Sequence, residues 1–276
     1  MSLRNSAAAP FRYFGERLRG LAFHAQSYFA LLVRALYGSV SRPFYTRDLA
    51  VQLDSIGVGS IGIVLLTGLF TGMVLALQSA VEMRQFGATI YIGRLVGAST
   101  VRELGPVLTA LMVTGRAGSG IAAEIGAMRV TEQIDALDTM GVDPIRKLVI
   151  PRFVACLVAL PLLTIVTDLV AILGGLLIAV VKLDLTPDLY MRSVYATLAQ
   201  TGFLLRVIPI DVFAGLVKPV FFGAIIAVTS CYYGLATRGG TEGVGRAATG
   251  AVVTSSIFIL ATDYFLTQLI IALLIE

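Results

Sequence analysis

A small set of ionisable side chains lies inside long apolar stretches of the sequence, and these residues indicate what chemistry the protein could do. They are Arg102, Glu103, Arg116, Asp168, Asp211, Lys218 and Asp263. An ionisable group in the hydrocarbon of a membrane costs several kcal/mol unless it is paired or reaches water. Such groups therefore either hold helices together as ion pairs or face a polar ligand.

Three of these groups are expected at a similar depth in the membrane. At a helix rise of about 1.5 Å per residue, Lys218 lies about 24 Å above the cytoplasmic end of its span, Asp263 about 21 Å and Glu103 about 30 Å. If the N-terminus is cytoplasmic, all three fall in the outer half of the membrane. They form either a polar cluster that faces a cavity or a structural ion pair that joins two spans, and the sequence leaves both interpretations open.

The composition indicates the class of protein that must position these groups. Hydrophobic residues make up 57% of the 276 residues, charged residues 14%, and the mean hydropathy is +0.88. These values are typical of an all-α integral membrane protein. Although the net charge is +4, Lys and Arg are spread between the apolar runs, which does not indicate nucleic acid as a partner. The runs predict five spans, near 55–81, 91–123, 152–181, 207–235 and 249–275.

The positive charges predict the orientation of these spans. If the N-terminus is cytoplasmic, the loops and tails on the inner side hold most of the arginines. The outer loops then hold only Arg84, Lys182 and Arg192, with Arg94 and Arg206 near span ends. Positive charge collects on the cytoplasmic side of membrane proteins. We therefore expect a cytoplasmic N-terminus, a C-terminus on the outer side and a cytoplasmic segment at 124–151.

Residues 1–54 are predicted to be an N-terminal interfacial amphipathic region, followed by a five-span domain at 55–276. The first segment lacks the uninterrupted apolar core of a signal peptide. Its apolar residues recur at helical spacing, opposite polar ones, which predicts a helix lying in the membrane surface. A helix packed on the rest of the protein is the alternative. The apolar face comprises Phe14, Leu18, Leu21, Ala25, Phe29, Leu32 and Leu36, and the single histidine, His24, is interpreted as a polar-face residue.

The segment after the second span predicts a separate short helix. Gly118, Ala122 and Gly126 first form a stripe of small residues that favours close helix packing. Between 131 and 143 the pattern becomes amphipathic, with Ile134 and Leu137 on one face and carboxylates on another. A left-handed Gly141 and the following Pro144 would end a helix of roughly three turns. It is either a solvated loop helix or an element that docks a partner.

Two glycine motifs carry no nucleotide chemistry. The glycines of 57–62 formally match a dinucleotide fingerprint, but no strand precedes them and an apolar span follows. The glycines of 115–120 lack the Lys-Ser/Thr of a phosphate-binding loop, so any ATPase must be another chain. In contrast, the GxxxG from Gly68 to Gly72 predicts a helix contact.

One continuous region resembles a known family. The sequences RELGPVLTAL, GRAGSGIAAEIGAM and TEQIDALDTMGVDPIRKLVIPR, within 102–152, are similar to the signature region of MlaE/YrbE-type permeases. Members of that family are the membrane subunits of bacterial lipid-transporting ABC systems. Weaker similarity, including VKP at Lys218 and TDYFLTQL near the end, extends over most of the chain.

The resemblance implies partners and a function. It implies a homodimer in the bacterial inner membrane, a cytoplasmic MlaF-like ATPase that binds ATP and Mg, a small MlaB-like STAS-domain protein on that ATPase, and a periplasmic MlaD-like MCE hexamer. Phospholipid would move between the inner membrane and the outer envelope, which maintains outer-membrane asymmetry. This chain would hold no cofactor and would catalyse no covalent reaction.

The resemblance also implies roles for particular residues. The positions matching Arg102, Glu103, Leu104, Lys218 and Asp263 lie at or near an outward-open lipid cavity between two protomers, and Phe86 falls where an aromatic residue lines that route. The cytoplasmic segment would be the coupling helix that contacts the ATPase. The residues expected to make this contact are Glu132, Gln133, Ile134, Asp135, Leu137, Met140, Gly141 and Asp143.

Two other classes of protein agree less well with the sequence. In an ion-coupled secondary carrier, Asp263, Glu103 and Lys218 would bind protons, but the sequence shows no inverted repeat of interrupted helices. In a membrane-embedded enzyme such as an acyltransferase, a nucleophile or metal constellation should accompany the single histidine, and none is recognisable. Both are weaker than the permease interpretation.

Overall fold

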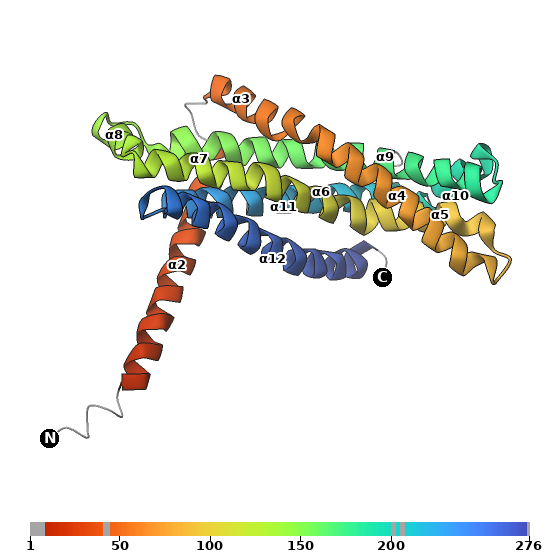
Figure 1. Cartoon of the computed structure of the whole chain (residues 1–276), viewed down its shortest axis with the longest axis horizontal. Coiled ribbons are helices and arrows are strands. Elements are labelled where there is room, and N and C mark those ends of the chain that lie inside the picture. Colours follow the sequence, from red (N-terminus) through yellow and green to blue (C-terminus); the bar gives the residue numbers. More distant parts are fainter. Residues whose placement is uncertain (1–8, 41–44, 200–202, 205–207, 275–276) are drawn as a thin grey trace.

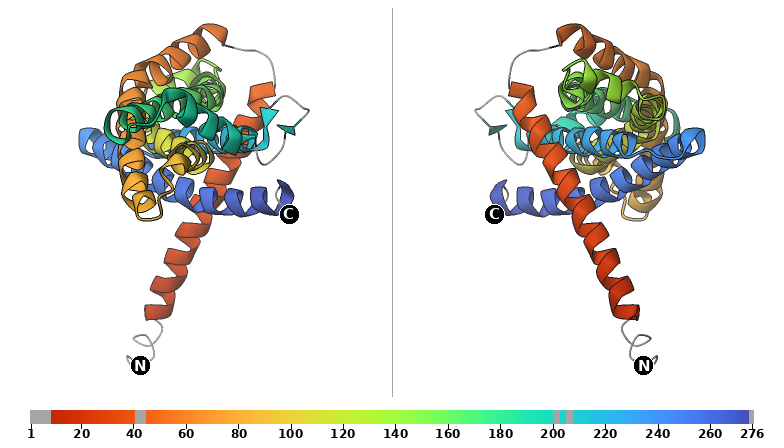
Figure 2. Two further views of the ribbon diagram at one scale, coloured as in Figure 1. Left: turned by 90° about the vertical axis from the view of Figure 1, so that its right-hand side faces the viewer. Right: turned by 90° about the vertical axis from the view of Figure 1, so that its left-hand side faces the viewer.

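The computed structural model describes residues 9–40, 45–199, 203–204 and 208–274, and these are almost entirely helical. Most of the long helices lie along one common axis, and α2 projects from this bundle at a steep angle (Figures 1 and 2). The α-helices are α2 (Ala9–Val40), α3 (Thr46–Ile56), α4 (Ile61–Arg84), α5 (Ile92–Ser99), α6 (Gly105–Val113), α7 (Ser119–Val130), α8 (Gln133–Thr139), α9 (Ile150–Leu183), α10 (Pro187–Leu198), α11 (Ile210–Leu235) and α12 (Gly240–Leu274).

Shorter elements connect or interrupt these helices. The 3-10 turns are η1 (Val58–Ser60) and η2 (Thr89–Tyr91), and the π-helical turns are η3 (Thr100–Leu104), η4 (Thr114–Gly118) and η5 (Ile145–Val149). Before α11, β1 (Phe203–Leu204) pairs antiparallel with β2 (Ile208–Pro209), with Phe203 opposite Pro209. A π turn inserts an extra residue into a helix and is frequent at functional sites.

Four helical runs in the described part of the chain are long and apolar enough to cross a membrane. They are Thr46–Arg84, Ile145–Leu183, Ile210–Leu235 and Gly240–Ala272, and they correspond to the first, third, fourth and fifth predicted spans. The predicted second span, 91–123, is not among them. Residues 92–123 of it lie within a continuous helical run from Ile92 to Val130, but its charged residues lower the hydropathy of that run. An all-helical membrane protein is confirmed, and the count of five spans stays a prediction.

Small residues bring α4 and α9 into close contact. A Cβ added at Gly72 would lie 1.8 Å from the carbonyl oxygen of Ala171, and one added at Gly174 would lie 2.4 Å from that of Leu69. The helix contact predicted for the GxxxG motif is therefore confirmed. The stripe of small residues at Gly118, Ala122 and Gly126 also packs closely on a neighbouring segment, because Gly118 contacts Ser230 of α11 and Gly126 contacts Thr237.

Replacing Gly72 by valine is expected to separate α4 from α9. The added side chain meets backbone atoms that cannot rotate away, and overpacking of this kind costs on the order of 1–3 kcal/mol or more. Gly62→Val in the same helix is the matched control, because a Cβ there meets nothing within 4 Å. Membrane abundance and thermal stability in detergent should fall for Gly72→Val alone. Equal behaviour of the two variants would contradict the contact.

The N-terminal helix α2 packs one face on the bundle and exposes another. Tyr28 hydrogen-bonds the hydroxyl of Thr229 over 3.0 Å, and Leu31 and Ala35 are buried. Of the predicted lipid face, Phe29 and Leu36 are exposed, whereas the side chains of Phe14, Leu18 and Leu21 lie outside the described residues. His24 is exposed and its Nδ1 lies 2.5 Å from the hydroxyl of Tyr232. The position of α2 in the membrane surface stays a prediction.

Candidate functional site

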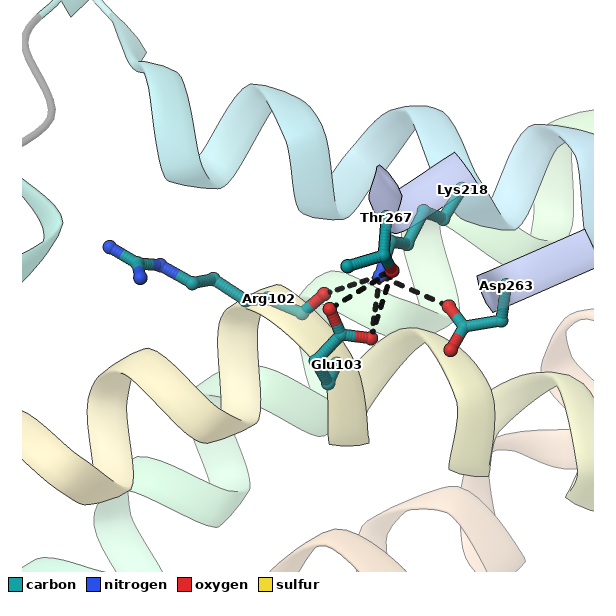
Figure 3. Close-up of polar contacts among 5 residues, drawn as sticks. All are labelled: Arg102, Glu103, Lys218, Asp263 and Thr267. Carbon is teal, nitrogen blue, oxygen red and sulfur yellow. Dashed lines mark hydrogen bonds and ion pairs between the residues drawn. The ribbon is translucent and has the colours of Figure 1, made fainter. Parts of the chain in front are cut away.

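The ammonium group of Lys218 is the centre of a polar cluster inside the bundle. Its Nζ lies 2.6 Å from Oε2 of Glu103, 2.8 Å from Oγ1 of Thr267, 2.9 Å from the carbonyl oxygen of Arg102 and 3.0 Å from Oδ1 of Asp263 (Figure 3). These five residues, here named the Lys218 cluster, come from η3, α11 and α12. The prediction that Glu103, Lys218 and Asp263 share one level of the membrane agrees with this geometry.

Two features of the backbone explain why Lys218 reaches η3. Pro106 has no N–H to donate to the carbonyl of Arg102 one turn earlier, so that oxygen is available to Lys218. Gly215 lies one turn before Lys218, and a Cβ there would lie 2.3 Å from the carbonyl oxygen of Val101. The absence of a side chain at Gly215 therefore lets α11 approach η3 closely enough for the contact.

The Lys218 cluster is buried on its cationic side and open on its acidic side. The side chain of Lys218 is 2% exposed, whereas those of Asp263 and Glu103 are 18% and 40% exposed. The sequence is compatible both with a structural ion pair and with a charged cluster that faces a cavity. The geometry shows the ion pair, because Lys218 joins α11 to α12, and it leaves the Glu103 side chain 40% exposed. That the charges face a cavity stays a prediction.

The other residues predicted for the same site have different environments. The side chain of Arg102 points away from the cluster (Figure 3), and its Nη2 lies 2.7 Å from Oδ2 of the buried Asp211. Leu104 is partly buried at the end of η3. Phe86 is exposed in the turn after α4 and is not among the contacts of the Lys218 cluster.

Thr267 is a member that sequence reasoning missed. Its hydroxyl accepts a hydrogen bond from Lys218 and lies 3.1 Å from Oε1 of Glu103, to which it can donate. The available signal was its position four residues after Asp263, which puts both on one face of α12. A threonine in an apolar helix is too common for this spacing to single it out.

The remaining charges in the apolar stretches lie apart from the Lys218 cluster. Arg116 donates from Nη1 to the carbonyl oxygen of Ser55, 2.9 Å away, and to Oγ of Ser60, 3.1 Å away. It thereby holds the junction of α3 and α4. Asp168 packs against Gly105, and its Oδ1 has no hydrogen-bond partner among the described residues.

The segment predicted to be cytoplasmic forms a helix shorter than the predicted three turns. The helix α8 covers Gln133–Thr139, because Glu132 takes a left-handed conformation (φ 60°) that separates it from α7. Gly141 has φ 76°, so the predicted left-handed glycine after the helix is confirmed. Asp143 then accepts a hydrogen bond from the backbone N–H of Ile145 and starts η5.

The apolar face of α8 is turned toward the protein itself. Ile134 is buried and Leu137 packs partly against the main core, so the ridge that we expected to face a partner is largely covered within this chain. The remaining predicted contact residues are exposed. They are Glu132, Gln133, Asp135, Met140, Gly141 and Asp143. Of these, Asp135 forms an ion pair with Arg129. We name Glu132, Gln133 and Met140 the outer face of α8.

An apolar helical bundle with ion pairs between its spans defines a multi-pass membrane protein. Residues 49–269 match the family model described as Permease MlaE. A probable ABC transporter permease protein of Rickettsia felis is 46% identical over 242 residues, which cover 87% of this chain and 90% of that protein. The chain belongs to the MlaE permease family and is a permease subunit of an ABC transporter.

Two further relatives come from Synechocystis and from Arabidopsis thaliana. A probable ABC transporter permease protein of Synechocystis is 42% identical over 239 residues, covering 87% of this chain and 86% of that protein. The chloroplastic protein TRIGALACTOSYLDIACYLGLYCEROL 1 of Arabidopsis thaliana is 36% identical over 238 residues, covering 86% of this chain and 64% of that protein. Because an ABC permease takes its energy from ATP, the chain works with a partner ATPase and not as an ion-coupled carrier.

Proposed function

We propose that this permease moves phospholipids between the inner membrane and the outer envelope of a bacterium, which maintains the lipid asymmetry of the outer membrane. The single observation that carries the proposal is the Lys218 cluster, which presents an accessible carboxylate inside a membrane helix bundle. An ionisable side chain within a span is costly, so its presence there indicates a functional role. Binding the polar head group of a lipid is such a role. The name of the Arabidopsis relative contains that of a glycolipid, which also favours a lipid as cargo.

The proposed assembly is a homodimer in the inner membrane, with a lipid cavity between its two protomers. Arg102, Glu103, Leu104, Lys218 and Asp263 would line this cavity, and Phe86 would lie along the lipid route. A cytoplasmic MlaF-like ATPase would bind ATP and Mg, with a small MlaB-like STAS-domain protein on it, and a periplasmic MlaD-like MCE hexamer would receive or deliver the lipid. The exposed apolar side chains of α12, among them Val253, Ile257 and Leu260, suit contact with acyl chains or with the second protomer.

The proposed mechanism is alternating exposure of the cavity. ATP binding would draw the two ATPases together, and the segment 124–151 would transmit this movement through α8 to α7 and α9. The helices would then close on the cavity and expel the lipid toward the periplasmic ring. No covalent bond of the lipid changes in this cycle.

The experiment that tests the function uses the permease purified with its partner ATPase. Mass spectrometry of the native complex should detect bound phospholipid, and proteoliposomes should transfer labelled phospholipid only with ATP and Mg. ATP hydrolysis without any bound or transferred lipid would overturn the proposal.

The orientation is tested separately. Because positive residues are rare in the loops assigned to the outside, a reporter fused after Glu276 should be active only in the periplasm. A reporter fused before residue 9 should show the opposite behaviour. Cytoplasmic activity of the C-terminal fusion would contradict both the five-span topology and the assignment of the Lys218 cluster to the outer half.

A further inference from the structure

The ammonium group of Lys218 has more acceptors around it than it has protons. A lysine ammonium carries three N–H donors. They are used by the carbonyl of Arg102, Oε2 of Glu103 and Oγ1 of Thr267. Oδ1 of Asp263 lies 3.0 Å from Nζ but has no hydrogen-bond partner in the described part of the chain. The Lys218 cluster therefore contains a spare acceptor.

The Lys218 cluster also contains a surplus of negative charge. Two carboxylates, Glu103 and Asp263, share the single ammonium of Lys218. The guanidinium of Arg102 does not compensate, because it points away (Figure 3) and pairs with Asp211. Within a span, an uncompensated carboxylate requires a further cation or a proton.

The surplus negative charge is on the accessible side of the cluster, although the spare acceptor, Oδ1 of Asp263, is itself buried. The ammonium of Lys218 is buried, whereas the Glu103 and Asp263 side chains are 40% and 18% exposed. A ligand that approaches the cluster consequently meets carboxylates first. A group that fits this environment carries one positive charge and several N–H donors.

We propose that the Lys218 cluster binds the primary ammonium of an aminophospholipid head group, with Asp263 and Glu103 as its acceptors. This inference rests on the proposed lipid-transport function and adds the head-group class to it. A primary ammonium supplies the missing positive charge and N–H donors for the two partly exposed carboxylates. A quaternary ammonium supplies only the charge, and a glycerol head group supplies hydroxyl donors on a lipid with a net negative charge.

The test compares three probes that share dioleoyl chains. The complex of permease and ATPase is reconstituted in vesicles of equal parts phosphatidylethanolamine, phosphatidylcholine and phosphatidylglycerol, and the lipids retained after purification are quantified by mass spectrometry. Phosphatidylethanolamine should exceed phosphatidylglycerol by about tenfold, the ratio expected when one charge-assisted hydrogen bond distinguishes the two lipids. Phosphatidylcholine should lie between them.

A charge-neutral variant identifies the residues responsible. Asp263→Asn removes the surplus charge with little change of shape, so the ratio of phosphatidylethanolamine to phosphatidylglycerol should fall toward one. Glu103→Gln should act in the same direction and serves if Asp263→Asn does not assemble. The matched control is Asp188→Asn, which changes an exposed carboxylate of α10 and should keep the wild-type ratio.

The outcomes separate this inference from the proposed function. Bound phospholipid without head-group preference in the wild type would overturn the ammonium site, while the transport proposal would stand. A preference unchanged in both cluster variants would also overturn it. Absence of bound phospholipid would instead contradict the transport function itself.

Discussion

Replacing Lys218 by alanine should remove most of the permease from the membrane, whereas replacing Asp263 by alanine should leave it abundant. The asymmetry follows from the arrangement of charges in the Lys218 cluster. Without Lys218, two carboxylates and the carbonyl of Arg102 lose their shared donor inside a span. Removing one partner of a buried charge pair costs on the order of 3–5 kcal/mol. Without Asp263, Lys218 keeps Glu103 and all three of its hydrogen bonds.

Combined variants test the same reasoning. If the loss in Lys218→Ala is caused by stranded negative charge, adding Glu103→Gln and Asp263→Asn should restore abundance without restoring lipid transport. The double change Lys218→Ala with Asp263→Ala should recover only in part, because Glu103 stays uncompensated. Membrane abundance by immunoblot and lipid transfer in proteoliposomes are the two measurements. An abundant and active Lys218→Ala protein would show that the cluster neither holds the helices together nor contacts substrate.

The sequence predicted which charges meet because helix rise converts residue number into depth. Counting residues along the predicted spans placed Glu103, Lys218 and Asp263 at a similar depth, and in the structure the three side chains meet. It could not predict that Arg102 contributes a carbonyl oxygen, since this depends on Pro106 and on the close approach at Gly215. Both are backbone effects that side-chain type and spacing do not reveal.

The spacing of apolar residues did not predict what the apolar face of a helix packs against. The pattern around Ile134 correctly indicated an amphipathic helix, but an apolar face can pack on its own protein or on a partner. In the structure Ile134 is buried in the main core of the chain. Similarly, the second predicted span is helical. Its charged residues lower its hydropathy, so it is not among the four helical runs that are long and apolar enough to cross a membrane.

Replacing Met140 by arginine is expected to release the partner ATPase while the permease remains in the membrane. Met140 is 68% exposed on the outer face of α8, so a charge there disturbs no internal packing. At a protein interface, loss of a central apolar contact costs about 2 kcal/mol or more, which is roughly a thirtyfold loss of affinity. Leu137→Arg is a poorer choice, because Leu137 packs on the core and its replacement would also destabilise the permease.

The ATPase retained by the tagged permease is measured after purification, together with membrane abundance and ATP-dependent lipid transfer. Met191→Arg is the matched control, since Met191 is an exposed methionine of α10, on the side of the membrane predicted to face away from the ATPase. Met140→Arg should lose the ATPase and lipid transfer at unchanged abundance, and Met191→Arg should lose neither. If Met140→Arg combined with Glu132→Lys still retains the full amount of ATPase, the outer face of α8 is a solvated surface and the coupling contact lies elsewhere on the permease.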